Sequence, residues 1–263
     1  MLNGLHDAEC RFKANEALGK FLVQSPDDID LDTIVWLAGK LRIEYGELDT
    51  ADGRLTAANN GGTIRVKSSI ANEGRRRFVI AHELGHYCLH KAMSAYDTAE
   101  DIRTWDEGSK ETEANVFAGE LLLPENLLKP LLYSCAPSLK AIDLLADKFK
   151  ISNLATGVQY VTYTMEPCAL VVSRGGSVSW ARKSKDFGYF IPRGQPVSSC
   201  SSAGEILSGK SGDTNGMVKT PAWAWLPNIH RNSRAMIMED SRHIEAYQMV
   251  VTLLWIDEIL EDD

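Results

Sequence analysis

Residues 82–90 read HELGHYCLH, three histidines within nine positions and a glutamate directly after the first. His82 and His86 are four positions apart, so in an α-helix both imidazole rings lie on one face. The surrounding sequence predicts a single helix from about Gly74 to Lys91 that carries the whole stretch. The pattern fits either a metal-binding centre or a polar helix that is rich in histidine. Residues elsewhere in the chain have to decide between these two interpretations.

The spacing HExxH matches what a metal-bound hydrolytic centre requires. Two imidazole nitrogens on one rigid helix can bind one Zn²⁺ ion at about 2.0–2.1 Å each. Glu83 lies about 100° further round the helix than His82, so its carboxylate is beside the metal without being a ligand. From there it can take a proton from water that the metal has made more acidic. The motif is short, however, and such a centre needs a third ligand.

The third ligand is predicted to be a glutamate from a later helix. Leu89 and Ala92 stand where the pattern HExxHxxGxxH needs glycine and histidine, so that class of centre is excluded. The segment KETEAN (110–115) offers Glu111 and Glu113, which point about 200° apart on a helix. Glu111 shares its face with Asn115, which could hydrogen-bond a ligand histidine and fix its orientation. We therefore favour Glu111 as the ligand, with Glu113 as the alternative.

Four other residues near the motif are weaker candidates. His90 lies one turn further along the ligand face, but a third ligand from the same straight helix would be strained. It is expected to be a helix-end histidine bonded to backbone or water. Cys88 faces the opposite side and is expected to pack in the core. Tyr87 and Arg77 could stabilise an oxyanion, but the sequence does not show whether their side chains lie near the metal.

Composition limits the class of protein. A chain of 263 residues suits one large domain or two modest ones, and no segment approaches the roughly 18 apolar residues that span a bilayer. The first residues lack the pattern of a signal peptide, and the five cysteines are scattered and never spaced as CxxC. Both observations favour a reducing cytoplasm. The net charge of −8 argues against a protein that coats nucleic acid. The basic runs at 74–77 and 182–185 are expected to be solvated surface.

Hydrophobic periodicity predicts mostly helices before residue 164 and short strands after it. Helices are predicted over 8–23, 30–41, 109–124 and, as a pair, within 138–164, with a strand over 61–67 and a polar connection over 97–108. Ser109 can cap its helix and Pro124 can end it. Short β-rich runs follow at 168–173, 177–183, 188–192, 222–227 and 234–240, before a final amphipathic stretch over 244–260. This change of texture predicts a second domain that begins near 164–168.

Two segments together resemble the ImmA/IrrE family of bacterial and phage metallopeptidases. They are RRRFVIAHELGHYCLH (75–90) and ETEANVFAGELLLP (111–124). SLKAIDLLADKFKIS (138–152) is similar to the helix-turn-helix-like element that follows the peptidase core in this family. The resemblance is strong over 60–130 and weaker beyond. It implies an α+β fold with a mostly helical, zincin-like domain of gluzincin type over 1–130 and a helix-turn-helix-like segment over 131–164. A smaller α/β, GAF-like sensor or docking domain would follow over 165–263.

The same resemblance implies an activity, a site and a partner. The metal ligands would be His82, His86 and Glu111, with Glu83 as the general base and Asn115 behind the ligands. Zinc is the expected cofactor, and Mn²⁺ is the alternative divalent ion. The implied function is a cytoplasmic endopeptidase that cleaves an XRE-type helix-turn-helix repressor, and so switches on a stress-response, mobile-element or phage-defence operon. The trigger stays open between a small molecule and a nucleic acid, and no membrane is involved.

Two other functions compete with the peptidase. The first is a DNA-binding or ligand-sensing regulator that uses 138–164 as its reading head. Its second helix, NLATGVQYVTYT (153–164), offers only Gln159 for base contact and no lysine or arginine, which disfavours recognition. The second is a silent sensor whose metal only holds the fold, although structural zinc sites tend to use four protein ligands. In the peptidase, the strand at 61–67 is expected to serve as an edge that pairs with substrate.

Overall fold

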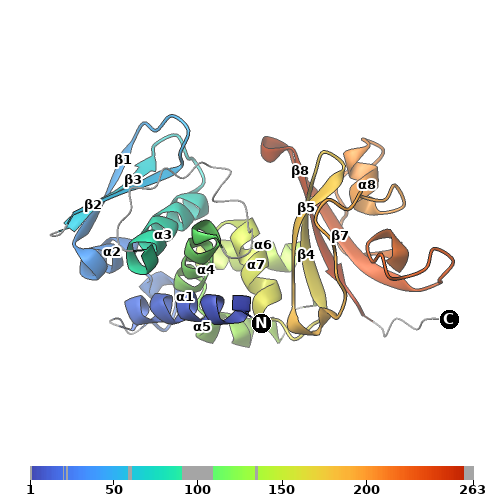
Figure 1. The fold of residues 1–263 in the computed structure, drawn as a ribbon, viewed down its shortest axis with the longest axis horizontal. Coiled ribbons are helices and arrows are strands. Elements are labelled where there is room, and N and C mark those ends of the chain that lie inside the picture. Colours follow the sequence, from blue (N-terminus) through green and yellow to red (C-terminus); the bar gives the residue numbers. More distant parts are fainter. Residues whose placement is uncertain are drawn as a thin grey trace. The chain divides into compact units, whose positions relative to one another are not determined.

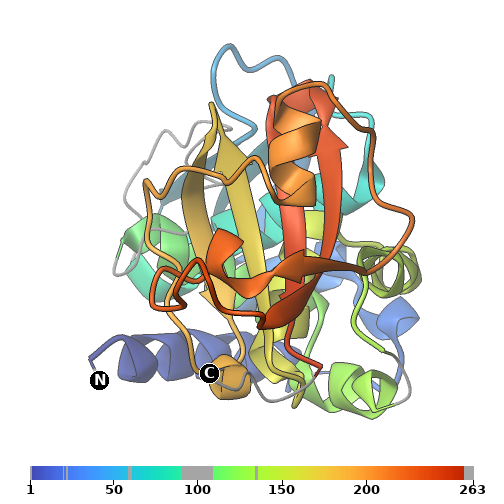
Figure 2. The same ribbon diagram turned by 90° about the vertical axis from the view of Figure 1, so that its right-hand side faces the viewer.

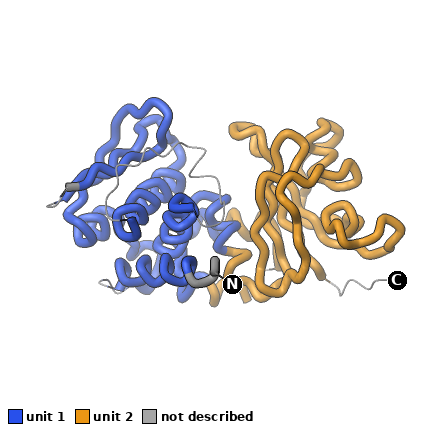
Figure 3. The backbone as a smooth tube through the Cα atoms, viewed as in Figure 1, with its two compact units in different colours: residues 1–128, 145–159 blue, residues 129–144, 160–263 orange. Residues whose placement is uncertain are grey.

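The computed structural model describes residues 2–19, 21, 23–58, 61–90, 109–133 and 136–257. The chain forms two compact units, coloured separately in Figure 3. Unit 1 comprises Met1–Leu128 and Leu145–Gln159, and unit 2 comprises Lys129–Leu144 and Tyr160–Asp263. The predicted polar connection at 97–108 lies outside the described residues. Within the described ranges, no helix has the length and apolar character that crossing a membrane requires.

Unit 1 is built around two helices that carry the sequence motifs. Its elements begin with α1 (Leu2–Leu18), α2 (Leu31–Gly39), α3 (Glu73–His90) and α4 (Lys110–Leu122). Helices α3 and α4 pack side by side (Figure 1). Their backbones approach closely at Gly85, where a β-carbon would lie 3.1 Å from Cα of Ala114. Ser109 caps α4 as predicted, because its side chain accepts a hydrogen bond from the Thr112 amide.

The first two helices differ from their predicted ranges. The helix expected over 8–23 is observed as α1, which starts six residues earlier and ends five residues earlier, at Leu2–Leu18. A short 3-10 turn, Pro26–Asp28, separates α1 from α2, and its Asp28 carboxylate accepts from the Ser25 amide at 2.8 Å. The helix expected over 30–41 ends at Gly39, because Lys40 takes a left-handed conformation with φ of 52°.

A three-stranded sheet in unit 1 lies next to α3. Its strands are β1 (Leu41–Gly46), β2 (Gly53–Ala58) and β3 (Gly61–Lys67), in the order β1-β3-β2. Strand β3 is confirmed, and Ile64 and Val66, which are two positions apart and share one face, are both fully buried. The expectation that this strand forms an edge is wrong, since β3 pairs in parallel with β1 and antiparallel with β2. The edge position falls to β2 instead.

Three helices follow α4 and contribute to both units. They are α5 (Glu125–Leu132), α6 (Leu139–Phe149) and α7 (Asn153–Tyr163). The predicted pair of short helices within 138–164 is confirmed as α6 and α7. Within unit 2, Asp240 accepts a 2.7 Å hydrogen bond from the amide of Leu139, which satisfies one of the free amides at the start of α6.

Unit 2 contains a five-stranded antiparallel sheet. Its strands are β4 (Cys168–Arg174), β5 (Ser177–Lys183), β6 (Val218–Pro221), β7 (Met236–Ile244) and β8 (Met249–Trp255), in the order β5-β4-β8-β7-β6. The short helix α8 (Ser202–Leu207) lies against one face of this sheet (Figure 2). The core on that face is apolar, with Trp225 and Phe187 fully buried against residues of β4, β7 and β8.

Three of the expected elements in unit 2 are wrong. The run at 188–192 contains no strand, and the run at 222–227 contains a 3-10 turn, Ala222–Ala224. The stretch at 244–260 is not amphipathic, because its main element, β8, has six consecutive buried residues. Because these consecutive residues alternate between the two faces of the sheet, both faces of β8 are covered, and the sequence shows a continuous apolar run.

Candidate metal centre

Helix α3 presents His82 and His86 from its buried face. Their exposed fractions are 0% and 4%, and the two Nε2 atoms lie 3.0 Å apart. This pairing follows from the helix geometry, because residues four positions apart lie one above the other. The amide of Arg75 donates to the Asn72 side chain at the start of α3, which helps to fix where the helix begins.

Helix α4 supplies Glu111 to the same point. Its Oε2 atom lies 3.2 Å from Nε2 of His82 and 3.4 Å from Nε2 of His86. Tetrahedral ligands at about 2.05 Å from one ion would be about 3.3 Å apart, so the three donor atoms fit the first coordination sphere of a zinc-sized ion. Imidazole nitrogens and carboxylate oxygens are also common ligands of divalent metal ions. The structure therefore brings together the three residues that the sequence predicted.

The charge of Glu111 suits a ligand. Burial raises the pKa of its carboxyl, but hydrogen bonds with His82 and His86 lower it by more, so the net pKa is below its ordinary value. The carboxylate form is therefore favoured in the metal-free protein as well. A metal ligand must be deprotonated, so this environment prepares Glu111 for coordination.

Asn115 orients one of the histidines from behind. Nδ1 of His82 donates to Oδ1 of Asn115 at 2.9 Å, and Asn115 is fully buried. An amide oxygen can only accept, so this bond places the proton of His82 on Nδ1. Nε2, which faces Glu111 and His86, is then the nitrogen that must be free of a proton when a metal binds. The bond thus selects the tautomer that can bind a metal.

Glu83 lies against the first residue of β2. It is only 1% exposed, and a β-carbon on Gly53 would lie 2.5 Å from its Oε1 atom. The side chain of Arg75 holds the neighbouring Asp52, with Nε donating to Oδ2 at 3.0 Å. Because Arg75 belongs to α3, this ion pair fastens the start of β2 to the helix that carries the motif.

Sequence reasoning missed the contribution of Gly53, Asp52 and Arg75. Gly53 gave one usable signal, since a glycine within a strand often marks a close approach of another group to the backbone. The pairing of Asp52 with Arg75 had no such signal, because the two residues are 23 positions apart.

The other candidates near the motif, Glu113, His90 and Cys88, lie outside the cluster of three. Glu113 has partners that the sequence did not predict, with Nδ1 of His6 at 3.0 Å and Nε2 of His90 at 3.6 Å. His90 also lies 3.3 Å from the backbone carbonyl of Lys110, in keeping with a helix-end role. Cys88 is half-buried and therefore not a core residue.

The two oxyanion candidates point to other contacts. Arg77 donates from Nη2 to the carbonyl of Ile29 at 3.2 Å. The ring of Tyr87 packs directly on Gly39, where even a β-carbon would overlap it. Neither residue belongs to the His82, His86 and Glu111 cluster.

Comparison with known proteins points to one family. The family model of the IrrE N-terminal-like domain matches residues 40–158. The metallopeptidase ImmA of Bacillus subtilis is 32% identical over 91 residues, which are 34% of this chain and 52% of ImmA. The radiation response metalloprotease IrrE of Deinococcus radiodurans is 28% identical over 134 residues, which are 49% of this chain and 38% of IrrE. The chain thus spans about half or less of these curated relatives.

A solved structure extends the likeness over nearly the whole fold. A transcriptional regulator from Mycobacterium tuberculosis superimposes with a TM-score of 0.60, covering 94% of this chain and 86% of that one. The sequence identity is 15%, so this likeness concerns the fold alone.

Proposed function

We propose that this chain, which belongs through residues 40–158 to the ImmA/IrrE family of metallopeptidases, is a zinc-dependent endopeptidase. The observation that carries the proposal is the convergence of His82, His86 and Glu111 at the separations of a tetrahedral ligand set. Three protein ligands leave a fourth position open, which is typical of catalytic zinc and not of structural zinc. Mn²⁺ is the alternative ion. The residues of the set are those of a gluzincin.

Glu83 is the general base in this proposal. A divalent ion held by the three ligands would polarise a peptide carbonyl and make water acidic enough to attack it. Glu83 follows a ligand on the same helix and is almost fully buried, so it can accept the proton of the attacking water. It can then pass that proton to the amine that leaves. Its seat against Gly53 restricts the positions that the carboxylate can take.

Strand β2 is the element that we propose to bind the substrate backbone. Its partner β3 occupies one side, and no strand among the described residues pairs with the other. The first residue of β2 contacts Glu83, so a peptide added along this edge would run past the base. This places on β2 the edge role that the sequence had suggested for β3.

The substrate we propose is an XRE-type helix-turn-helix repressor, cleaved in the cytoplasm to switch on a stress-response, mobile-element or phage-defence operon. Family membership supports a protein substrate. We retain the division into a peptidase domain (1–130), a helix-turn-helix-like segment (131–164) and a GAF-like sensor or docking domain (165–263) as part of the proposal. A small molecule or a nucleic acid would supply the trigger.

A DNA-reading role for residues 138–164 has less support. Gln159, the one residue of the second helix suited to base contact, is 3% exposed and donates to the carbonyl of Leu123 at 3.2 Å. A buried side chain that already donates to the backbone just after α4 cannot reach a base edge. Sequence-specific duplex binding by the full chain, lost when exposed residues of α7 are substituted, would favour that alternative.

The test of the peptidase is cleavage of a small helix-turn-helix repressor encoded beside this gene. The purified chain is incubated with that repressor, and fragments are mapped by mass spectrometry, with and without a chelator. We expect Glu83→Gln to retain the fold and the metal but to lose cleavage, because the amide cannot accept the proton. Full cleavage by this variant, or by the chelated protein, would exclude the proposed mechanism.

A further inference from the structure

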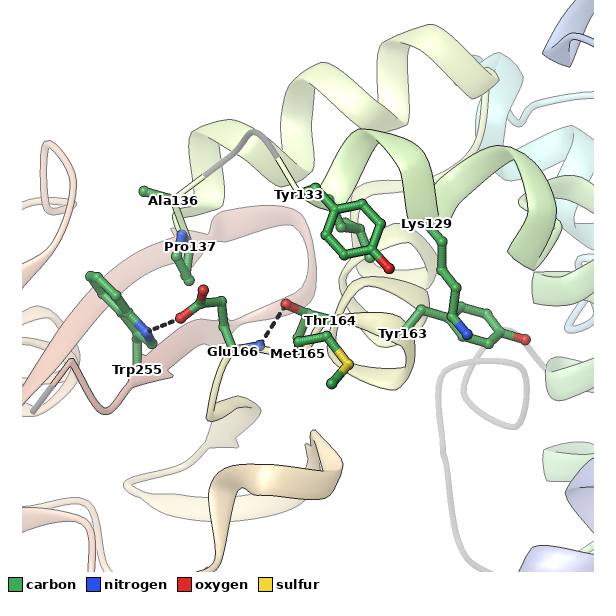
Figure 4. Close-up of a pocket in the computed structure, with 10 residues that line it drawn as sticks. Lys129, Tyr133, Ala136, Pro137, Tyr163, Thr164, Met165, Glu166 and Trp255 are labelled. Atoms are coloured by element: carbon green, nitrogen blue, oxygen red, sulfur yellow. Dashed lines mark hydrogen bonds between the residues drawn. The ribbon is translucent and has the colours of Figure 1, made fainter. Parts of the chain in front are cut away.

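Unit 2 contains a pocket that the proposed peptidase does not use. It has a volume of about 370 Å³, within the range of about 300–1,000 Å³ for sites that take small groups. The ends of α5, α7 and β8 converge on it (Figure 4). Three aromatic side chains line it, namely Tyr133, Tyr163 and Trp255.

One glutamate in the pocket, Glu166, is held through its backbone and through one oxygen of its carboxylate. The backbone amide of Glu166 donates to Oγ1 of Thr164 at 3.1 Å, and its carbonyl accepts from Oγ of Ser184 at 2.7 Å. Nε1 of Trp255 donates to Oε2 of the Glu166 carboxylate at 3.0 Å, as Figure 4 shows. The other oxygen, Oε1, makes no hydrogen bond with any residue that the structure describes. The carboxylate is therefore positioned before a ligand arrives, which reduces the entropic cost of binding.

One cation of the protein itself, the ammonium group of Lys129, already lies over an aromatic ring of the pocket. Nζ of Lys129 lies 5.8 Å from the ring centroid of Tyr163, within the range of a cation–π contact. Glu166, beside Trp255, provides a carboxylate next to a second aromatic ring. A fixed carboxylate beside aromatic faces suits a flat guanidinium group, which can stack on a ring and donate hydrogen bonds in its own plane.

We propose that this pocket binds the guanidinium group of an arginine side chain on a protein partner. The guanidinium would donate to Oε1 of Glu166 and stack on the neighbouring aromatic rings. The mouth of the pocket is open, since Tyr133 is 79% exposed and Met165 is 69% exposed. An open rim suits a side chain that projects from another protein, whereas small ligands are usually enclosed over about 70–90% of their surface. The inference does not depend on the metal centre.

The charge of Lys129 makes the proposal specific. Lys129 lines the same pocket and repels a second cation there. Removing its charge should strengthen the binding of arginine, whereas removing the charge of Glu166 should weaken it. A pocket built for an anion would respond to both substitutions in the opposite sense.

The test is a titration of the full-length protein with N-acetyl-L-arginine amide, followed by NMR of the tryptophan indole N–H signals. Trp255→Phe identifies the signal of Trp255. N-acetyl-L-citrulline amide has the same shape without the charge and is the matched probe. We expect a saturable shift of the Trp255 signal with the arginine probe in the millimolar range, and none with citrulline.

Three variants complete the test. Glu166→Gln should weaken binding of the arginine probe at least about tenfold, because a charge-assisted hydrogen bond is lost. Lys129→Met should tighten binding. Glu205→Gln removes an exposed carboxylate of α8, outside the pocket, and should change nothing. Equal binding of citrulline, loss of binding in Lys129→Met, or no saturable shift in the parent protein would each overturn the proposal.

Discussion

Gly53 and Glu83 fit together so closely that no larger residue can stand at position 53 without a shift. A β-carbon there would lie 2.5 Å from Oε1 of Glu83 and 2.6 Å from Cγ1 of Val79. Glu83 comes from α3 and Gly53 from the first position of β2, so this contact joins the proposed base to the proposed substrate strand. Glycine is needed here for its lack of a side chain.

Gly53→Ala should therefore slow cleavage more than it weakens the metal site. The added methyl group displaces the Glu83 carboxylate, and a misplacement of about 1 Å can cost about 100-fold in rate. The effect should fall on kcat and less on KM, measured with the repressor substrate, while zinc affinity stays near that of the parent.

Two further variants separate the displacement of Glu83 from a loss of stability. Gly46→Ala is the control in the same sheet, since its β-carbon would make an ordinary contact, 3.5 Å from Cδ of Arg65. Adding Val79→Ala to Gly53→Ala removes the apolar part of the clash and should raise the melting temperature without restoring kcat. Parent-like turnover in Gly53→Ala would show that Glu83 does not depend on this seat.

Glu111→Gln and Glu113→Gln form a matched pair that tests the third ligand. Both residues lie in the first turn of α4, but only the carboxylate of Glu111 joins the histidine pair. We expect Glu111→Gln to lower zinc affinity by more than about 100-fold, since losing an outer-shell partner alone costs about 10–100-fold. Glu113→Gln should retain the affinity. A competition titration with a zinc chelator measures both, and equal losses would contradict the assignment.

Substitutions of Asn115 should affect the metal through His82. Asn115→Leu removes the acceptor of the Nδ1 proton, and we expect zinc affinity to fall about 10–100-fold. Asn115→Asp keeps an acceptor of the same shape and should retain the affinity. The same chelator competition measures both variants. Melting temperatures of the metal-free variants report any loss of folding, and a loss of affinity in Asn115→Asp equal to that in Asn115→Leu would rule out the orienting role.

Glu239 should be important for the stability of unit 2. It is fully buried in β7 and accepts from the Ala203 amide at 2.8 Å, from Oγ1 of Thr220 at 2.7 Å and from Oγ of Ser241 at 2.9 Å. Glu239→Ala leaves three buried donors without their partner and should lower the free energy of unfolding by about 3 kcal/mol or more. Urea denaturation measures the change. Glu205→Ala, on the exposed side of α8, should cost less than about 0.5 kcal/mol.

Local sequence patterns were enough to predict the three residues that meet at the candidate metal centre. The four-residue spacing of His82 and His86, and that of Glu111 and Asn115, each specify one helix face because the α-helix repeats every 3.6 residues. The cap at Ser109 is equally local. These features depend on residues within one or two helical turns, so they can be predicted without knowledge of the tertiary contacts.

Sheet positions were harder to predict from local patterns. Strand β3 has the alternation of a strand, yet nothing within it reveals that β1 and β2 pair on both sides. Strand β8 has an apolar run that fits a helix or a strand, and its backbone pairing with β4 and β7 decides between them. Sheet order arises from pairings between distant segments, which leave little trace in a short window of sequence.

The sequence by itself predicted the three side chains that the structure brings together, and the carboxylate that we propose acts beside them. Only the tertiary structure placed β2 against Glu83 and gathered Glu166, Trp255 and Lys129 around one pocket. The physical reason is the separation in sequence between the residues that interact. Helix faces follow from backbone hydrogen bonds between near neighbours, whereas these two sites exist because packing brings together residues that are far apart in the chain.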